Sequence, residues 1–192
     1  MGLVRFPVEK YASLELNQVA FPQNTLVVSQ TPLGTEYTEG APCENGMWVL
    51  ADKSKGTIGS CVAATDKPIG IVYTSEKEYD YMHYGLKTFG RKIAGDYPRV
   101  GVLSLGDTMT SNCFQYDNSE AGFTTAEALE ATLKAFATTP VYVVPVAGSS
   151  VPKLTKVKPT AVSNIIPTYG KVTKYYTMPN GEKGIKYQIV NI

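Results

Sequence analysis

The stretch 47–73 reads MWVLADKSKGTIGSCVAATDKPIGIVY and carries the strongest indication of fold class. It holds three short apolar runs, Met47-Trp48-Val49-Leu50, Ser60-Cys61-Val62-Ala63-Ala64 and Ile69-Gly70-Ile71-Val72-Tyr73. Charged or glycine-containing segments separate the runs. Apolar runs of this length between turn residues are typical of β-strands rather than helices. We therefore expect one strand in each run, arranged as a meander or as part of a barrel.

The rest of the chain repeats this pattern. Further strands are predicted at 26–28, 87–93, 100–105, 108–114, 141–146, 171–178 and 184–192. Pro145 places the strand 141–146 at a sheet edge or at a bulge, because proline cannot donate a ladder hydrogen bond. Gly106-Asp107 is expected to form a tight turn and Asn180-Gly181 a hairpin.

One segment, 125–136, is predicted to be helical. Leu129, Leu133 and Phe136 fall on one face of that helix. Thr124 or Thr125 supplies its N-cap, with Glu127 three residues after Thr124 as in a capping box. The predicted fold class is therefore all-β, a mainly antiparallel barrel or sandwich with one short α-helix and an extended N-terminal arm.

The chain is expected to have three parts. Residues 1–24 form an extended arm, 25–150 a β-rich core with the helix near 125–136, and 151–192 a basic segment that ends in a β-hairpin and packs on the core. The arm has no sustained apolar period and buries little against itself, so it is expected to lie on this domain, a neighbouring subunit or a larger assembly. Residues 151–167 are predicted to be connecting chain.

Charge is distributed unevenly along the chain. The formal net charge is +1, but residues 151–192 hold seven lysines and one acid, Glu182, a balance of +6 that leaves −5 for residues 1–150. A net charge near zero argues against general affinity for nucleic acid. The basic end fits docking on an acidic neighbour, with a solvated lysine surface as the alternative. No run approaches the roughly 20 apolar residues that span a bilayer, so we expect no membrane partner. We expect the chain to be made as a soluble cytosolic product.

Few residues suggest catalysis or metal binding. A nucleophilic Ser or Cys needs a base beside it, and the single histidine is His83. There is no G-x-S-x-G elbow, no phosphate-binding glycine loop and no closed zinc motif. Cys43, Cys61 and Cys113 are expected to be buried reduced thiols, with a disulfide plus one leftover thiol as the alternative. We expect no enzyme, cofactor or metal site, although acids assembled by the fold leave a hydrolase open.

Three stretches together resemble a known family. They are Glu44-Asn45-Gly46-Met47-Trp48-Val49-Leu50, Lys67-Pro68-Ile69-Gly70-Ile71-Val72, and residues 97–112, which read YPRVGVLSLGDTMTSN. Over roughly residues 40–115 the chain resembles the capsid decoration, or auxiliary head, proteins of tailed bacteriophages of low-GC Gram-positive hosts. The resemblance implies a β-rich module, made in the host cytoplasm, that sits on the outside of the virion. Its implied partner is the major capsid protein, whose neighbouring subunits it would cement as a trimer or as a monomer at local symmetry axes.

Candidate partner-binding residues lie in the arm and in a tyrosine-rich run. In the arm they are Arg5, Phe6 and Tyr11; in the run they are Tyr79, Tyr81 and Tyr84, which accompany Tyr73 and His83. Tyrosine rings are enriched in protein interfaces and sugar-binding platforms. The run therefore leaves a second function open, a binding module for carbohydrate or a host surface. Packing of alternate tyrosines against one side of a strand is the structural alternative.

Overall fold

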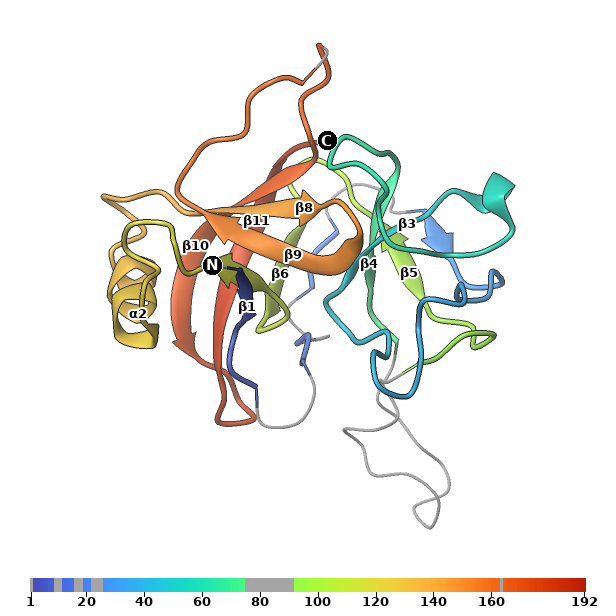
Figure 1. The fold of residues 1–192 in the computed structure, drawn as a ribbon, viewed down its shortest axis with the longest axis horizontal. Helices are drawn as coiled ribbons and strands as arrows, with labels where there is room; N and C mark the ends of the chain where they lie inside the picture. The colour runs from blue at the N-terminus through green and yellow to red at the C-terminus, as the bar shows by residue number, and fades with distance from the viewer. Residues whose placement is uncertain (1, 9–11, 16–18, 22–25, 75–91, 163) are drawn as a thin grey trace.

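The computed structural model describes residues 2–8, 12–15, 19–21, 26–74, 92–162 and 164–192. The described chain forms two sheets, one of seven strands and one of four, with a single short α-helix. Figure 1 shows the larger sheet beside the smaller one, with the helix on the outer side of the larger sheet. The all-β, sandwich-like prediction with one short helix is confirmed.

The four-stranded sheet has the strand order β2-β5-β4-β3 and is antiparallel throughout. Its strands are β2 (Val27–Val28), β5 (Val100–Val102), β4 (Ile69–Val72) and β3 (Trp48–Leu50). A 3-10 turn, η2 (Lys53–Lys55), follows β3. Strands β3 and β4 are buried along their whole length, which explains why their sequences are continuously apolar rather than alternating.

The predicted strand at Ser60–Ala64 is wrong, because this run forms turns instead. The Asp66 carboxylate accepts hydrogen bonds from the backbone N–H groups of Val62 (2.7 Å) and Ala63 (2.8 Å). An aspartate that binds nearby backbone donors offers them an alternative to a sheet ladder. The apolar residues alone did not reveal this competition.

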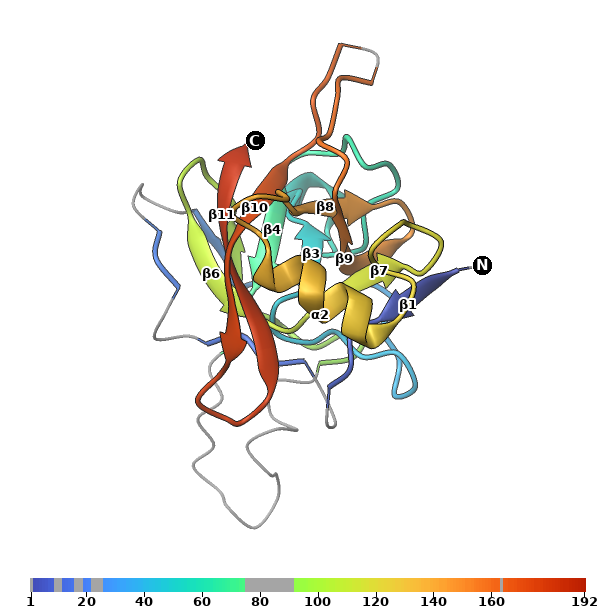
Figure 2. The ribbon, with the colours of Figure 1, turned by 90° about the vertical axis from the view of Figure 1, so that its left-hand side faces the viewer.

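The seven-stranded sheet curls around the main core. Its order is β1 (Leu3–Arg5), β7 (Gln115–Asp117), β9 (Ser149–Thr155), β8 (Tyr142–Val146), β10 (Tyr169–Thr177), β11 (Lys183–Asn191) and β6 (Thr108–Ser111). Strands β6 and β7 stand toward opposite ends of this order, yet only residues 112–114 separate them in the chain. The sheet must therefore curve strongly, and Figure 2 shows β6 on one side of it and β7 and β1 on the other.

Two prolines share an irregular region of this sheet. The register of β8 on β9 shifts between Val144↔Lys153 and Val146↔Ser149, so the predicted bulge at Pro145 is confirmed. Pro152 lies in the same interval on β9. Proline has no N–H to donate to a neighbouring strand, and an irregular position tolerates that loss. The prediction that 151–167 is connecting chain is wrong for its first residues, since β9 runs to Thr155. The predicted C-terminal hairpin is confirmed as β10–β11.

The N-terminal arm lies along the outer edge of residues 108–117. Strand β1 pairs antiparallel with β7, and the Phe6 N–H donates to the Phe114 carbonyl at 2.9 Å. Further along, Leu14 pairs with Ser111 and Ala20 with Thr108. The arm thus covers an edge that would otherwise expose unpaired backbone groups.

The helix α2 (Ala126–Lys134) lies within the predicted segment. Thr125 is its N-cap, and its hydroxyl accepts from the Ala128 N–H at 3.2 Å. Glu127 therefore stands one position too early for the predicted capping box. Leu129 and Leu133 are buried, as their shared face predicts, and the helix packs against β10.

Trp48 and Tyr187 join the two sheets. Both side chains are fully buried, and the indole Nε1–H of Trp48 on β3 donates to the hydroxyl of Tyr187 on β11 at 3.1 Å. Ile69 and Ile71 of the small sheet belong to the same core cluster as Ile185 of the large one. The two sheets therefore share this cluster, while Val49, Val72 and Val100 of the small sheet belong to a second one.

Replacing Gly46 by alanine is expected to cost about 3 kcal/mol of unfolding free energy. Gly46 has φ +89°, and an added Cβ would lie 2.7 Å from Cys113 Cβ and closer still to Ser111 Oγ. The left-handed backbone costs about 1–2 kcal/mol and overpacking a similar amount. Urea unfolding followed by Trp48 fluorescence measures the loss. Gly148→Ala is the control, because Gly148 also has positive φ but open space around it, and equal losses in both variants would contradict the clash.

Asp107 gives the fold a pH dependence that we expect to measure. Burial raises the pKa of its carboxyl to about 6, although one oxygen accepts from the Ser104 N–H at 2.7 Å. A raised pKa means that the folded state holds the proton more tightly, so this group lowers stability as pH rises from about 4 to 6. The unfolding free energy of Asp107→Asn relative to wild type should therefore increase by up to about 3 kcal/mol between pH 4 and 7. Parallel pH profiles for the two proteins would contradict this.

Candidate functional site

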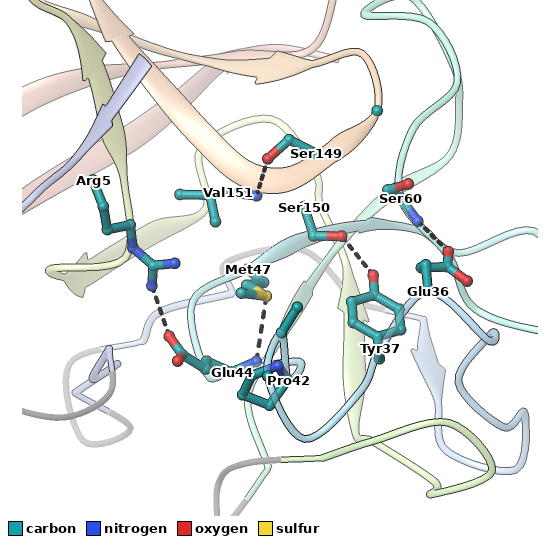
Figure 3. A pocket seen from close by; sticks show the side chains of 13 residues that line it. Arg5, Glu36, Tyr37, Pro42, Glu44, Met47, Ser60, Ser149, Ser150 and Val151 are labelled. Atoms are coloured by element: carbon teal, nitrogen blue, oxygen red, sulfur yellow. Dashed lines mark hydrogen bonds and ion pairs between the residues drawn. The ribbon is translucent and has the colours of Figure 1, made fainter. Parts of the chain in front are cut away.

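A recess of about 400 Å³, lined by both polar and apolar groups, lies where the arm, the loop before β3 and the turn between β8 and β9 come together. Figure 3 shows Arg5 entering from one side, Glu44 and Met47 below, and Ser149, Ser150 and Val151 from the turn above. These residues are far apart in sequence. Pairing of β1 with β7 and of β7 with β9 brings Arg5 near the turn, and side-chain contacts join the loop before β3 to both.

Glu44 ties the arm to this recess. Its side-chain Oε2 accepts from Arg5 Nη2 at 2.6 Å and from the Ala12 backbone N–H at 3.1 Å. Glu44 is 7% exposed, so these are charge-assisted bonds in a largely dry setting, where they are strong. The carboxylate therefore holds two separate points of the arm.

Two further contacts close the recess. The Tyr37 hydroxyl and the Ser150 hydroxyl share a hydrogen bond, and Glu36 Oε1 accepts from the Ser60 N–H at 3.1 Å. Burial, with a smaller contribution from Cys43, raises the pKa of Tyr37 above its usual value, so this phenol stays neutral. Both contacts link the loop before β3 to another part of the chain. The recess is therefore a junction at which contacts from three parts of the chain position the arm.

The three cysteines are free and buried, which confirms the prediction of buried thiols. Burial raises the pKa of Cys61 to about 11 and that of Cys113 to about 12, and raises that of Cys43 as well. Protonated thiols are poor nucleophiles and poor metal ligands. Among the described residues, no group of three or more His, Cys, Asp and Glu side chains could hold a metal ion.

Arg5 and Phe6, predicted to bind a partner, make contacts inside this chain. Arg5 pairs with Glu44, and Phe6 is 6% exposed with its ring 4.5 Å from that of Phe114. The Phe6 side chain belongs to the core, because the arm folds back on the domain. Its predicted part in a partner contact would require the arm to detach.

The remaining predicted partner-binding residues, Tyr11, Tyr79, Tyr81 and Tyr84, lie outside the described residues, as does His83. Tyr73 is described. Its ring packs edge-on against Phe21 at 5.8 Å, and the Arg99 guanidinium lies 5.3 Å above it and donates to its hydroxyl. Tyr73 is thus held by packing on the small sheet.

The segment between β9 and β10, residues 156–162 and 164–168, lies almost wholly within the predicted connecting chain, and we call it the projection. Figure 1 shows it standing out from the body of the molecule. Its exposed apolar side chains are Val157, Val162, Ile165 and Ile166, the first two 69% and 59% exposed. Val162 and Ile165 pair through two backbone hydrogen bonds of 2.9 and 3.0 Å, which closes the tip. The apolar residues were visible in the sequence, but their exposure was not.

An apolar groove of about 450 Å³ lies beside the projection. Leu3 of β1, Val144, Pro145 and Val146 of β8, and Val157 and Val162 of the projection contribute its apolar lining. Of the described residues that line it, Lys153 and Lys158 are the charged ones. The groove is therefore a basic, apolar surface.

The chain matches no protein-family model, no curated protein and no solved structure. In the part of the chain that the structure describes, no helix has the length and hydropathy needed to cross a membrane. The function is therefore proposed from the residues of the chain itself.

Proposed function

We propose that this chain is a structural virion protein that binds the outer surface of a bacteriophage head and stabilises contacts between major capsid subunits. The observation that carries the proposal is the projection, a protruding segment with four exposed apolar side chains. Apolar side chains gathered on a protruding segment favour burial against another surface. The proposed site of action is the virion, after assembly in the host cytoplasm.

The sequence resemblance to capsid decoration proteins supports the same function. Its three stretches correspond to β3 with the turn before it, to β4, and to β5 through β6. Strands β3, β4 and β5 are neighbours in the small sheet, so these parts of the resembling stretches are contiguous in space, while β6 belongs to the seven-stranded sheet. A shared spatial unit fits a common module better than scattered matches would.

The repeated surface of a head suits a protein with small contact areas. A specific stable interface buries about 1,200–2,000 Å² in total, more than a groove of this size provides. A trimer bound at three points would gain affinity by multivalency without any new contact, because its binding sites are linked. The proposed partners are therefore the major capsid protein and, secondarily, other copies of this chain.

Heads of the encoding phage that lack this chain provide the test. We expect purified chain to bind them saturably in co-sedimentation and to raise the temperature at which they release DNA. Heads that already carry the protein are the control and should bind little more. Chain that stays in the supernatant at all concentrations would refute the function. Binding to glycans that is lost in Tyr81→Ala and Tyr84→Ala would instead favour the carbohydrate-binding alternative.

A further inference from the structure

We propose that the groove and the projection together bind an extended segment of the major capsid protein that carries apolar side chains flanked by carboxylates. This inference rests on the proposed function and adds to it the docking surface and the chemistry of the partner segment. The apolar lining, the charge of the rim, and the anchoring of the projection each support a part of it.

The apolar lining defines the centre of the partner segment. Leu3 is 43% exposed and Val157 69% exposed, and both face a groove of about 450 Å³. That volume accommodates a few apolar side chains and not a folded domain. Strand β8 and the projection line the groove together, so an extended chain laid along it would contact both.

The charge of the rim defines the flanks of the partner segment. Lys158 is exposed and Lys153 half-buried, and both line the groove. Asp117 lies outside the lining. Hydrogen bonds from Ser119, and more weakly the charge of Lys153, lower the pKa of its carboxyl. Asp117 is therefore ionised and offsets part of the Lys153 charge.

Glu120, which accepts from the Thr155 hydroxyl, is a second carboxylate beside the lining, and Lys156 follows Thr155 in the chain. Lys153, Lys156 and Lys158 still outnumber the two acids, and this excess favours carboxylates on the partner over a basic segment.

The projection is anchored at both ends, so the groove exists before a partner arrives. At its start, the Lys156 N–H donates to Glu120 Oε1 at 2.6 Å. At its end, Asn191 Nδ2 donates to the Pro167 carbonyl at 2.9 Å. Anchored stems and the paired tip reduce the ordering entropy lost on binding. A preformed groove fits a partner that is itself fixed on a lattice.

Binding of full-length variants to heads that lack this chain tests the surface. We expect Val162→Asp and Lys158→Glu each to raise the concentration for half-saturation at least tenfold. Val162→Asp would bury a charge in the apolar groove when the partner binds, and Lys158→Glu reverses the sign of one charge on the rim. Matched controls are Leu26→Asp, whose side chain is 58% exposed against 59% for Val162, and Lys171→Glu on β10. These should change half-saturation less than twofold. Unchanged unfolding midpoints, read from Trp48 fluorescence, show that each variant is folded.

A photo-crosslinking residue at Val157 tests the partner's chemistry. On saturated heads it is expected to label a major capsid segment that contains apolar residues with Asp or Glu beside them. Labelling of a basic segment, of another copy of this chain, or of nothing would overturn the inference. So would wild-type binding that Val162→Asp and Lys158→Glu leave unaltered, and in that case the proposed function stands. If wild-type chain fails to bind heads at all, the function and the inference fall together.

Discussion

A Trp48→Ala variant is expected to lose about 5 kcal/mol of unfolding free energy, a large part of the stability of an ordinary domain. Trp48 is 1% exposed and contacts the core of both sheets. Its removal leaves a cavity of indole size and deprives the Tyr187 hydroxyl of its donor. Because Trp48 is the single tryptophan, far-UV circular dichroism in urea follows the unfolding of this variant.

Two comparisons separate packing from hydrogen bonding at this contact. Tyr187→Phe removes only the hydroxyl that accepts from Trp48, so it should cost about 1–3 kcal/mol, the usual penalty for a buried donor left without a partner. Val62→Ala, at a side chain that is 78% exposed, should change stability by less than about 0.5 kcal/mol. Similar losses in Trp48→Ala and Val62→Ala would mean that the two sheets do not depend on this side chain.

Glu44→Ala is expected to lose about 3 kcal/mol and to loosen the arm. Removing one member of a buried ion pair costs about 3–5 kcal/mol, but the Arg5 side chain is 35% exposed, so water screens part of that cost. Here the variant leaves the Arg5 guanidinium without its carboxylate partner and the Ala12 N–H without its acceptor. Urea unfolding by Trp48 fluorescence measures the stability. Trypsin cleavage after Arg5 should become faster, because that bond is accessible once the arm leaves β7.

Glu127→Ala is the control for Glu44→Ala. Glu127 is an exposed acid in the first turn of α2, and its loss should cost less than about 1 kcal/mol and leave cleavage after Arg5 unchanged. Glu44→Gln keeps an oxygen that can accept from Ala12 but lacks the charge, so it should fall between the other two. A Glu44→Ala protein with wild-type stability and wild-type cleavage would show that the arm is held by its backbone pairing alone.

Features governed by neighbouring residues could be predicted. The helix at 126–134 follows from the spacing of Leu129 and Leu133, and the bulge at Pro145 follows from a missing N–H. The strand expected at 60–64 failed because the Asp66 carboxylate captured two backbone donors. The strand at 149–155 was partly missed because Pro152 is tolerated only where the β8–β9 register is broken, with residues 150–152 facing the single residue Pro145. In both cases the apolar or proline pattern of the segment itself did not include the residues outside it that decide its structure.

By itself the sequence determined the all-β class, the single helix, the C-terminal hairpin and the segregation of positive charge, since each depends on side-chain periodicity, turn residues or composition. Only the tertiary structure decided that Arg5 meets Glu44, that Trp48 meets Tyr187, and that the apolar residues of the projection face outward. The physical reason is the same in each case. The first two contacts join residues 39 and 139 positions apart in the chain, and the third feature depends on whether other segments cover the projection. The register and curvature of the sheets set both.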